Sequence, residues 1–436
     1  MKKLLCIILC FLMLTGCNIV TFSMDNLLTA PSIADDQAAI SRALVDAVGD
    51  ITPVYPKSGE YRSAFIVENI DSEAGKEALA FYLTDTQRGS IVAVAVLDQN
   101  ENGEWQFVSS SNGLGDYIKS VIICRYPTVT DVIIGYGTTA YEESAVGIYR
   151  YAGSSLALLY AGNYSLLDRA DIDNCGEEET IILEQTDTAV NVKAIKTTNG
   201  YNYTTNEYNL STDALEISSL KFGRIDDESG DINGMYIDLI DDSGKAVTEI
   251  VYLRDGALVS PTTQDPYLLM LTRRLSHYRS VDYNGDGVIE IPVAAPFLGY
   301  YNSLASEAEY LTYWQVYNID FGAFETYSFG YYDLDGDYAF NIPGEWLDSV
   351  SLRANSETGV VTFVEYDPTL ALEDMQEILS LVAIQPSQED EFLEQGFVSI
   401  AKLETVLYMY KLADDISDSL EITEDEIIGR FYYFNY

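Results

Sequence analysis

The chain has 436 residues, of which 69 are acidic and 24 basic, and its formal net charge is −45. Such a surface repels phosphate backbones and attracts cations, so nucleic acid is not an expected partner. Hydrophobic residues make up 47% of the chain, with 34 Tyr and 16 Phe, which is enough for a large core. A chain of this length predicts two or three domains, or one repeat array with an added module.

The N-terminal segment is typical of an export signal. Lys2 and Lys3 precede an apolar run at residues 4–14. A run of about 11 residues spans only ~16 Å as a helix, which is too short for a ~30 Å hydrocarbon core. The residues that close the run, Leu-Thr-Gly-Cys17, resemble a lipobox, in which the cysteine takes a diacylglycerol and residues 1–16 are removed. An ordinary signal peptide that ends near a cysteine is the alternative.

We therefore expect a lipid on Cys17 to hold the chain at the outer face of a bacterial cell membrane, with residues 17–34 as a tether. Buried acyl chains contribute about 0.8 kcal/mol per CH₂ group, so two or three chains anchor a protein firmly. No later stretch of the sequence reaches about 18 apolar residues, so no other span is expected. After the leader, only Cys124 and Cys175 remain. A buried free thiol at Cys124 is the simplest interpretation, and a disulfide between the two is the alternative.

Residues 35–54 are expected to form an amphipathic helix and the entry to the body of the protein. Between Asp35 and Val48 the apolar residues recur at helical spacing. Asp35 and Asp36 stand at the expected start, where acidic side chains favour a helix N-terminus. The helix is expected to pack against the body.

From residue 55 to residue 330, short alternating or β-branched runs follow one another, separated by Gly, Asn and Asp turns. An acidic turn followed by an apolar strand recurs near residues 69–81, 171–183, 226–239 and 282–293. A period of about 50–60 residues suits a four-stranded propeller blade. The pattern predicts a mainly β fold, with a β-propeller of about five four-stranded blades. A pair of β-sandwich domains is the alternative.

Residues 331–436 have a different texture and predict a small C-terminal α+β module. The expected strands cover residues 338–346, 350–352, 360–366 and 397–412. Apolar residues at helical spacing predict an amphipathic helix over residues 369–384. A second, acidic helix is expected after Pro386 through Gln395, and a short one at residues 424–428.

The strongest local signal for a binding site is the loop from Asp282 to Glu290. Ca²⁺ takes about six to eight oxygen ligands, which a tight loop supplies from alternate positions. The ligands offered at positions one, three, five, seven and nine are Asp282, Asn284, Asp286, Val288 (through its carbonyl) and Glu290. The loop predicts a structural Ca²⁺ site. An acidic turn held by its own backbone hydrogen bonds is the alternative.

A weaker version of this loop covers residues 171–179. Asp171, Asp173 and Glu179 hold the first, third and ninth positions. Cys175 holds the fifth position, and its soft sulfur suits Ca²⁺ poorly.

Three other acidic stretches are expected to be turns without a metal. The acids near residues 69–73 and 226–228 have broken spacing, and those at residues 333–337 lack the glycine that the loop needs. The last of these is expected to lead into the C-terminal module.

The acidic loop followed by an apolar strand, best seen at residues 282–290, resembles the FG-GAP/VCBS-type repeats of integrin-like β-propellers. The order along residues 35–330 resembles a group of lipoproteins of Gram-positive anaerobic bacteria that carry such repeats. The resemblance implies an extracellular propeller, with Glu290 in the place of the ninth-position ligand.

Motifs of catalysis are missing from the sequence. His277 is the single histidine, so a His-rich metal centre is excluded, and it is expected on a helix as a surface or partly buried residue. Neither a Gly-x-Ser-x-Gly elbow nor a Gly-rich phosphate loop is present. A carboxylate pair for glycoside hydrolysis stays open, because 69 acids allow many pairs.

The sequence thus favours a non-catalytic, lipid-anchored binding or scaffold protein with calcium in at least one blade, whose ligand is an extracellular protein or glycan. The first alternative is a surface polysaccharide-active enzyme with two carboxylates flanked by aromatic rings. The aromatic residues 300–317 offer such rings, although Tyr is also a preferred strand residue. The second alternative is a partner in envelope assembly that acts through the C-terminal module.

Overall fold

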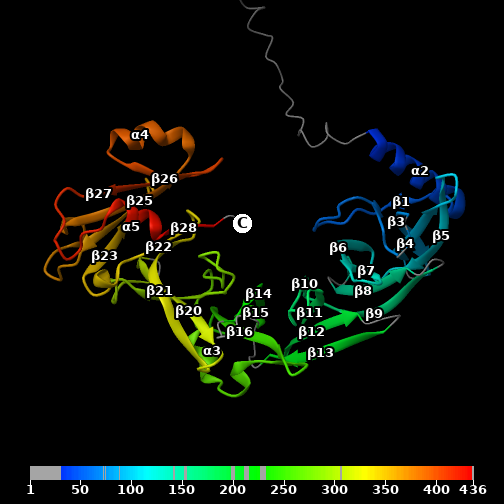
Figure 1. Cartoon of the computed structure of the whole chain (residues 1–436), viewed down its shortest axis with the longest axis horizontal. Coiled ribbons are helices and arrows are strands. Elements are labelled where there is room, and N and C mark those ends of the chain that lie inside the picture. The colour runs from blue at the N-terminus through cyan, green and yellow to red at the C-terminus, as the bar shows by residue number, and fades with distance from the viewer. Residues whose placement is uncertain are drawn as a thin grey trace, which may run out of the picture. The chain divides into compact units, whose positions relative to one another are not determined.

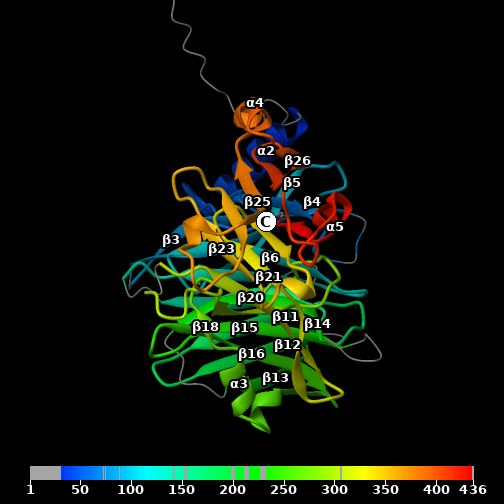
Figure 2. The same ribbon diagram turned by 90° about the vertical axis from the view of Figure 1, so that its left-hand side faces the viewer.

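The computed structural model describes residues 31–71, 73, 75–87, 89–140, 143–151, 155–197, 202–210, 216–225, 232–304 and 307–434. The expected leader and Cys17 lie outside these residues, as do residues 226–228. The chain divides into two compact units between Asn163 and Tyr164. Strands account for 51% and helices for 11% of the structure (Figures 1 and 2), so the mainly β prediction is confirmed. Among the described residues, none of the helices combines the length and apolarity needed to cross a bilayer.

The described residues of the first unit form one helix and two antiparallel sheets. The helix is α2 (Pro31–Val48). The first sheet contains β1 (Thr52–Pro53), β2 (Phe65–Glu68), β3 (Glu77–Thr86), β4 (Gly89–Gln99) and β5 (Trp105–Asn112), in the order β1-β3-β4-β5 with β2 also on β3. The second sheet has the order β6 (Tyr117–Arg125), β7 (Thr130–Gly137), β8 (Ser144–Tyr151) and β9 (Leu156–Asn163).

Helix α2 confirms the predicted helix but begins earlier than expected. Its first residue is Pro31, a residue that favours the first helical turn because its φ is already helical. The first turn therefore contains no acidic residue, and the prediction that Asp35 and Asp36 lie at the helix start was wrong. Ile40 and Leu44 are fully buried in a cluster with residues of the first sheet, so the helix packs on the body as expected.

The second unit contains four antiparallel sheets. The first has the order β10 (Leu166–Ala170), β11 (Glu179–Gln185), β12 (Val190–Thr197) and β13 (Tyr203–Asn209). The next has β14 (Glu216–Arg224), β15 (Asn233–Ile240), β16 (Lys245–Arg254) and β17 (Ala257–Val259), with β18 (Arg274–Leu275) on β16. The short helix α3 (Tyr267–Leu271) precedes β18.

The remaining two sheets lie in the C-terminal part of the second unit. One has the order β19 (Ile291–Pro296), β20 (Tyr310–Asn318), β21 (Ala323–Asp333), β22 (Tyr338–Asn341) and β28 (Phe431–Tyr433). The other has the order β23 (Val350–Ala354), β24 (Val361–Glu365), β25 (Glu377–Ile384), β27 (Leu407–Leu412) and β26 (Val398–Lys402). The short helices α4 (Glu389–Glu394) and α5 (Glu424–Gly429) confirm the two predicted after Pro386.

The predicted amphipathic helix at residues 369–384 was wrong. A single helical turn covers Leu372–Asp374, and strand β25 covers Glu377–Ile384. Ile378 to Val382 are all buried, so the strand is covered on both faces and shows no alternation. A short apolar run of this kind fits a helix and a buried strand equally well.

The domain boundary expected after residue 330 falls inside a strand. β21 runs across that position, and its sheet is completed by β22 and by β28 at the end of the chain. The last strand of the chain, β28, therefore belongs to the same sheet as β19 and β20.

Sheets that follow one another in sequence share hydrophobic cores within each unit. In the first unit, Leu79 and Phe81 of β3 lie in one cluster with Ile123 of β6 and Val132 of β7. In the second unit, the sheets β10–β13 and β14–β17 share another cluster, and the later sheets continue the pattern. Each sheet has four or five strands and none closes on itself.

The two described cysteines are not joined by a disulfide, and Cys124 is buried whereas Cys175 is exposed. The buried, unbridged thiol predicted at Cys124 is confirmed, and the alternative of a disulfide was wrong.

Candidate metal centre

Loop 282–290 lies in the second unit, directly before β19. Its ends are held together by two backbone hydrogen bonds of 3.0 Å between Val281 and Glu290. Within this neck, the chain turns tightly at Gly285 and Gly287, whose φ values are 78° and 87°. Glycine adopts such positive φ values without the steric cost that a Cβ would add.

The side chain of Asp282 organises the backbone of the loop. Its Oδ1 accepts hydrogen bonds from the N–H groups of Gly285 (2.7 Å) and Asp286 (3.1 Å). Its Oδ2 accepts one from Gly287 (2.9 Å). Hydrogen bonds from backbone N–H groups to a carboxylate are strong, so the loop is wrapped around its first residue.

The side chains of positions three, five and nine meet on one side of the loop. The side-chain nitrogen of Asn284 donates to Asp286 Oδ2 and to Glu290 Oε1, each at 3.0 Å. An N–H₂ group thus lies between two carboxylates. The oxygen of the same amide accepts from the N–H of Asp286 (2.8 Å), so turning the amide to bring this oxygen between the carboxylates would break that hydrogen bond. Three oxygens brought together in this way would repel one another unless a cation lay between them.

Glu290 is the buried member of this group, with 1% of its surface exposed. Its Oε2 accepts a hydrogen bond from the N–H of Tyr283 (3.2 Å). Burial, and then the charges of Asp286 and Asp282, raise the pKa of Glu290 to about 8. A cation in the loop would favour the ionised carboxylate and oppose this shift.

The structure brings Asn284 against Asp286 and Glu290, whereas the carboxylate of Asp282 accepts from backbone N–H groups. Among the described residues, the acidic and cysteine side chains whose ligand atoms lie within 4.8 Å of one another are instead those of the sister loop at residues 171–179. Val288 donates its backbone N–H to Asp286 Oδ1 (2.8 Å). Sequence reasoning missed Arg224 of β14, whose side chain donates to the carbonyl of Asp286 (2.7 Å) and whose backbone N–H donates to that of Gly287 (2.8 Å). The metal itself stays a prediction.

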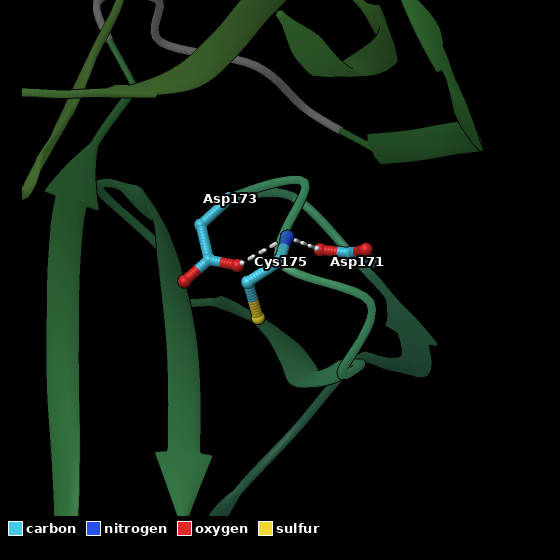
Figure 3. Close-up of side chains that lie close together, drawn as sticks. All are labelled: Asp171, Asp173 and Cys175. Atoms are coloured by element: carbon cyan, nitrogen blue, oxygen red, sulfur yellow. Dashed lines mark hydrogen bonds between the residues drawn. The ribbon is translucent and has the colours of Figure 1, made fainter. Parts of the chain in front are cut away.

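The sister loop at residues 171–179 shares several of these internal hydrogen bonds. Asp171 accepts from the N–H groups of Cys175 (3.0 Å) and Gly176 (2.7 Å). Asp173 also accepts from the N–H of Cys175 (3.2 Å), as Figure 3 shows. One ligand atom from each of Asp171, Asp173 and Cys175 lies within 4.8 Å of the others.

In this sister loop, the ammonium of Lys196 lies among the side chains of positions three, five and nine. Its Nζ is 2.5 Å from Asp173 Oδ2, 2.8 Å from Cys175 Sγ and 3.3 Å from Glu179 Oε1. Sequence reasoning missed this residue because it lies on the next strand, β12. Only the register of the hairpin, in which Thr180 pairs with Ile195, places Lys196 beside Glu179.

Two of the other acidic stretches are described. The loop before β3 closes like the two above, because Glu77 Oε2 accepts from the N–H of Ile70 (2.8 Å). Asp333 accepts from the N–H groups of Asp335 (3.0 Å) and Gly336 (2.8 Å), which confirms a turn between β21 and β22.

His277 lies in an exposed turn after β18, so the prediction of a helix at this position was wrong. The preceding residues, Arg274 and Leu275, pair with β16 as a strand, and the chain turns away immediately afterwards. His277 lines a pocket of about 370 Å³ together with Tyr278, Glu309, Tyr310, Tyr331 and Asp333.

Three carboxyl groups line this pocket, those of Glu309, Asp333 and Asp335, and two of them have raised pKa values. Burial, and then the charge of Asp333, raise the pKa of Glu309. Burial is also the main cause of the raised pKa of Asp333, partly offset by hydrogen bonds from the N–H groups of Gly336 and Asp335. Paired carboxyl groups with raised pKa values in a pocket are features of acid–base sites.

Comparisons with known proteins give no family for this chain. No protein-family model and no curated protein matches it. A protein of Bacteroides fragilis assigned as a 6-phosphogluconolactonase is 11% identical over 75% of this chain and 92% of its own, with a TM-score of 0.26. The CNH domain of AfRom2 is 11% identical over 84% of this chain and 99% of its own, with a TM-score of 0.23. Scores this low carry no argument about fold or function.

Proposed function

We propose that this chain is a non-catalytic, lipid-anchored binding or scaffold protein of the bacterial cell surface, with a calcium-stabilised β-propeller of the FG-GAP/VCBS type. The observation that carries the proposal is the convergence of Asn284, Asp286 and Glu290 in a loop already shaped by Asp282. Ca²⁺ would neutralise these carboxylates and hold the loop before β19.

The arrangement of the sheets supports a propeller. Five sheets of four or five strands begin between residues 52 and 296, and successive sheets within each unit share a core, as the blades of a propeller do. The sheet β23–β27 would be a further blade or a cap after them. A radial arrangement leaves the loops between strands exposed, where they are free to bind a partner.

The calcium part of the proposal is tested by unfolding the purified chain in urea with Ca²⁺ and with a chelator. We expect Ca²⁺ to raise the unfolding midpoint of the second unit, and Mg²⁺ at the same concentration to have a smaller effect, because Mg²⁺ dehydrates reluctantly. Glu290→Gln should remove the calcium effect, whereas Glu325→Gln on β21 should leave it. An unchanged wild-type midpoint would overturn the calcium site.

The lipid anchor is tested separately. Mass spectrometry of the N-terminal peptide from membrane fractions should show a lipid-modified Cys17, and Cys17→Ser should move the protein out of the membrane fraction. An unmodified residue 17 on a protein that still carries residues 1–16 would overturn the surface location.

A polysaccharide-active enzyme is a second candidate, which the pocket of Glu309 and Asp333 favours. Two carboxyl groups flanked by Tyr278, Tyr310 and Tyr331 are the groups that glycoside hydrolysis needs. The test is release of reducing ends from envelope polysaccharide. Activity that Glu309→Gln or Asp333→Asn abolishes, but the exposed Asp320→Asn retains, would favour an enzyme, whereas inactivity of the wild type would reject it.

A further inference from the structure

Loops 171–179 and 282–290 share the hydrogen bonds that the side chains of positions one, three and nine accept from the N–H groups of positions five, six and two. The Oδ2 atoms of Asp171 and Asp282 accept from the glycine at position six, at 2.7 and 2.9 Å. The ninth-position carboxylates of Glu179 and Glu290 accept from the N–H of position two, at 2.9 and 3.2 Å. The two loops therefore offer the same backbone frame to whatever lies between their side chains.

The two loops differ in the residue that lies opposite the ninth-position glutamate on the next strand. In the sister loop, Thr180 pairs with Ile195, so the next residue pair in register is Glu179 and Lys196. Before β19, Ile291 pairs with Gln315, so Glu290 has Val316 opposite it. Val316 is apolar and 5% exposed, and it supplies no charge.

We propose that Lys196 is a tethered cation, which fills loop 171–179 in place of a metal ion and so decides that this loop takes none. The ammonium offers three donors, and its three neighbours at 2.5–3.3 Å are the side chains of positions three, five and nine. The contrast with loop 282–290 rests on the proposed calcium site, whereas the contacts of Lys196 do not.

The charges of the sister loop agree with this role. Partial burial would lower the pKa of Lys196, but hydrogen bonds to Asp173 and Cys175 and the charge of Glu179 outweigh it and raise that pKa. Burial and the neighbouring Asp173 raise the pKa of the Cys175 thiol, which keeps it neutral. One ammonium thus meets two carboxylates and a thiol.

The first unit contains an independent case of the same arrangement. Asp131, at the start of β7, pairs directly with Arg150 of β8. The guanidinium Nε and Nη2 lie 2.7 and 2.9 Å from the two carboxylate oxygens, and both side chains are buried. A basic residue on the following strand therefore neutralises an acid at this position in two sheets.

The test uses the full chain with the substitution Glu290→Gln, which removes metal binding by loop 282–290, and Cd²⁺ is the probe. A Cd²⁺–thiolate bond gives a charge-transfer absorption in the ultraviolet, which Cys175→Ser assigns to this loop. With Lys196 present, we expect no such signal. Lys196→Met should allow Asp171, Asp173, Cys175 and Glu179 to bind Cd²⁺ at least about tenfold more tightly, because the repelling ammonium is gone. Lys193→Met is the matched control, since that lysine also lies on β12 and pairs with Glu184 at 3.1 Å.

The outcomes separate this inference from the proposed function. A Cys175 signal of equal strength with Lys196 present would overturn the inference, as would a folded Lys196→Met chain that binds no Cd²⁺. A Lys196→Met chain that folds only with Cd²⁺ would support it. If Ca²⁺ does not change the unfolding midpoint of the wild type, the calcium site is rejected and the inference about Lys196 still stands.

Discussion

Loops 171–179 and 282–290 have the same backbone frame and a carboxylate at position nine, yet they differ in how that carboxylate is neutralised. Glu179 has a lysine ammonium at 3.3 Å. Glu290 has no basic partner in the described part of the chain, and its pKa is raised to about 8, first by burial. An acidic turn can thus be neutralised by a side chain of the fold or left open to an ion, and one residue on the next strand separates the two cases.

Removing the buried ion pair between Arg150 and Asp131 should lower the unfolding free energy more than any other change proposed here. Arg150→Met removes the guanidinium that neutralises the buried carboxylate of Asp131 in the first unit, which should cost about 3–5 kcal/mol of unfolding free energy. The control is Arg125→Met, whose partner Glu68 is partly exposed, and which should cost about 0–1 kcal/mol. Urea unfolding followed on the first unit measures both. Equal losses would show that burial of the pair is not what matters.

The second prediction concerns the loss of Ca²⁺ from loop 282–290. At a Ca²⁺ concentration about 100 times the dissociation constant, the wild type should gain about 2.7 kcal/mol over the chelated protein. Glu290→Gln should lose most of that gain, because the buried ligand can no longer give a charged oxygen. A variant that keeps the full gain would place the ion elsewhere.

The arrangement at Glu179 can also be built opposite Glu290 by one substitution. Val316→Lys puts an ammonium opposite Glu290, in the register position that Lys196 has opposite Glu179. We expect the stabilisation by Ca²⁺ to fall by at least about 1 kcal/mol, because the ion must compete with a charge already in place. Val316→Met keeps the apolar bulk and is the control. An undiminished calcium effect with Val316→Lys would contradict the role of this position.

The second unit also contains a carboxylate that is paired with a buried arginine, Asp238 with Arg274, and its contribution to stability should depend on pH. Burial would raise the pKa of Asp238, but the charge of Arg274 and hydrogen bonds from Thr248 and Ser280 lower it below its ordinary value of 3.8. A carboxylate with a depressed folded pKa stabilises the fold above its unfolded pKa and loses that contribution as the pH falls. Unfolding free energies should therefore diverge between wild type and Asp238→Asn above about pH 4 and converge below it. A constant difference down to pH 2 would contradict this.

Strand content and the tight loop at residues 282–290 could be predicted from sequence because both depend on local pattern. Short alternating or β-branched runs predicted β3, β4, β7, β11 and β16, and the acidic spacing from Asp282 to Glu290 predicted the tight loop before β19. Lys196 and Arg224 could not be found this way, because only strand register and sheet packing bring them to the loops. The helix expected at residues 369–384 failed because a strand buried on both faces has no period of its own.

The last prediction compares how much each contact of Lys196 contributes to the stability of loop 171–179. Cys175 is exposed and its thiol is a weak acceptor, so the carboxylates of Asp173 and Glu179 should provide most of the attraction. Cys175→Ser should then change the unfolding free energy by no more than about 0.5 kcal/mol, as exposed substitutions usually do. Asp173→Asn, which removes a charge 2.5 Å from Nζ, should cost more than Cys175→Ser in the same urea titration. If the order were reversed, the sulfur would be the main partner of the lysine, and the loop would not be a carboxylate site completed by a tethered cation.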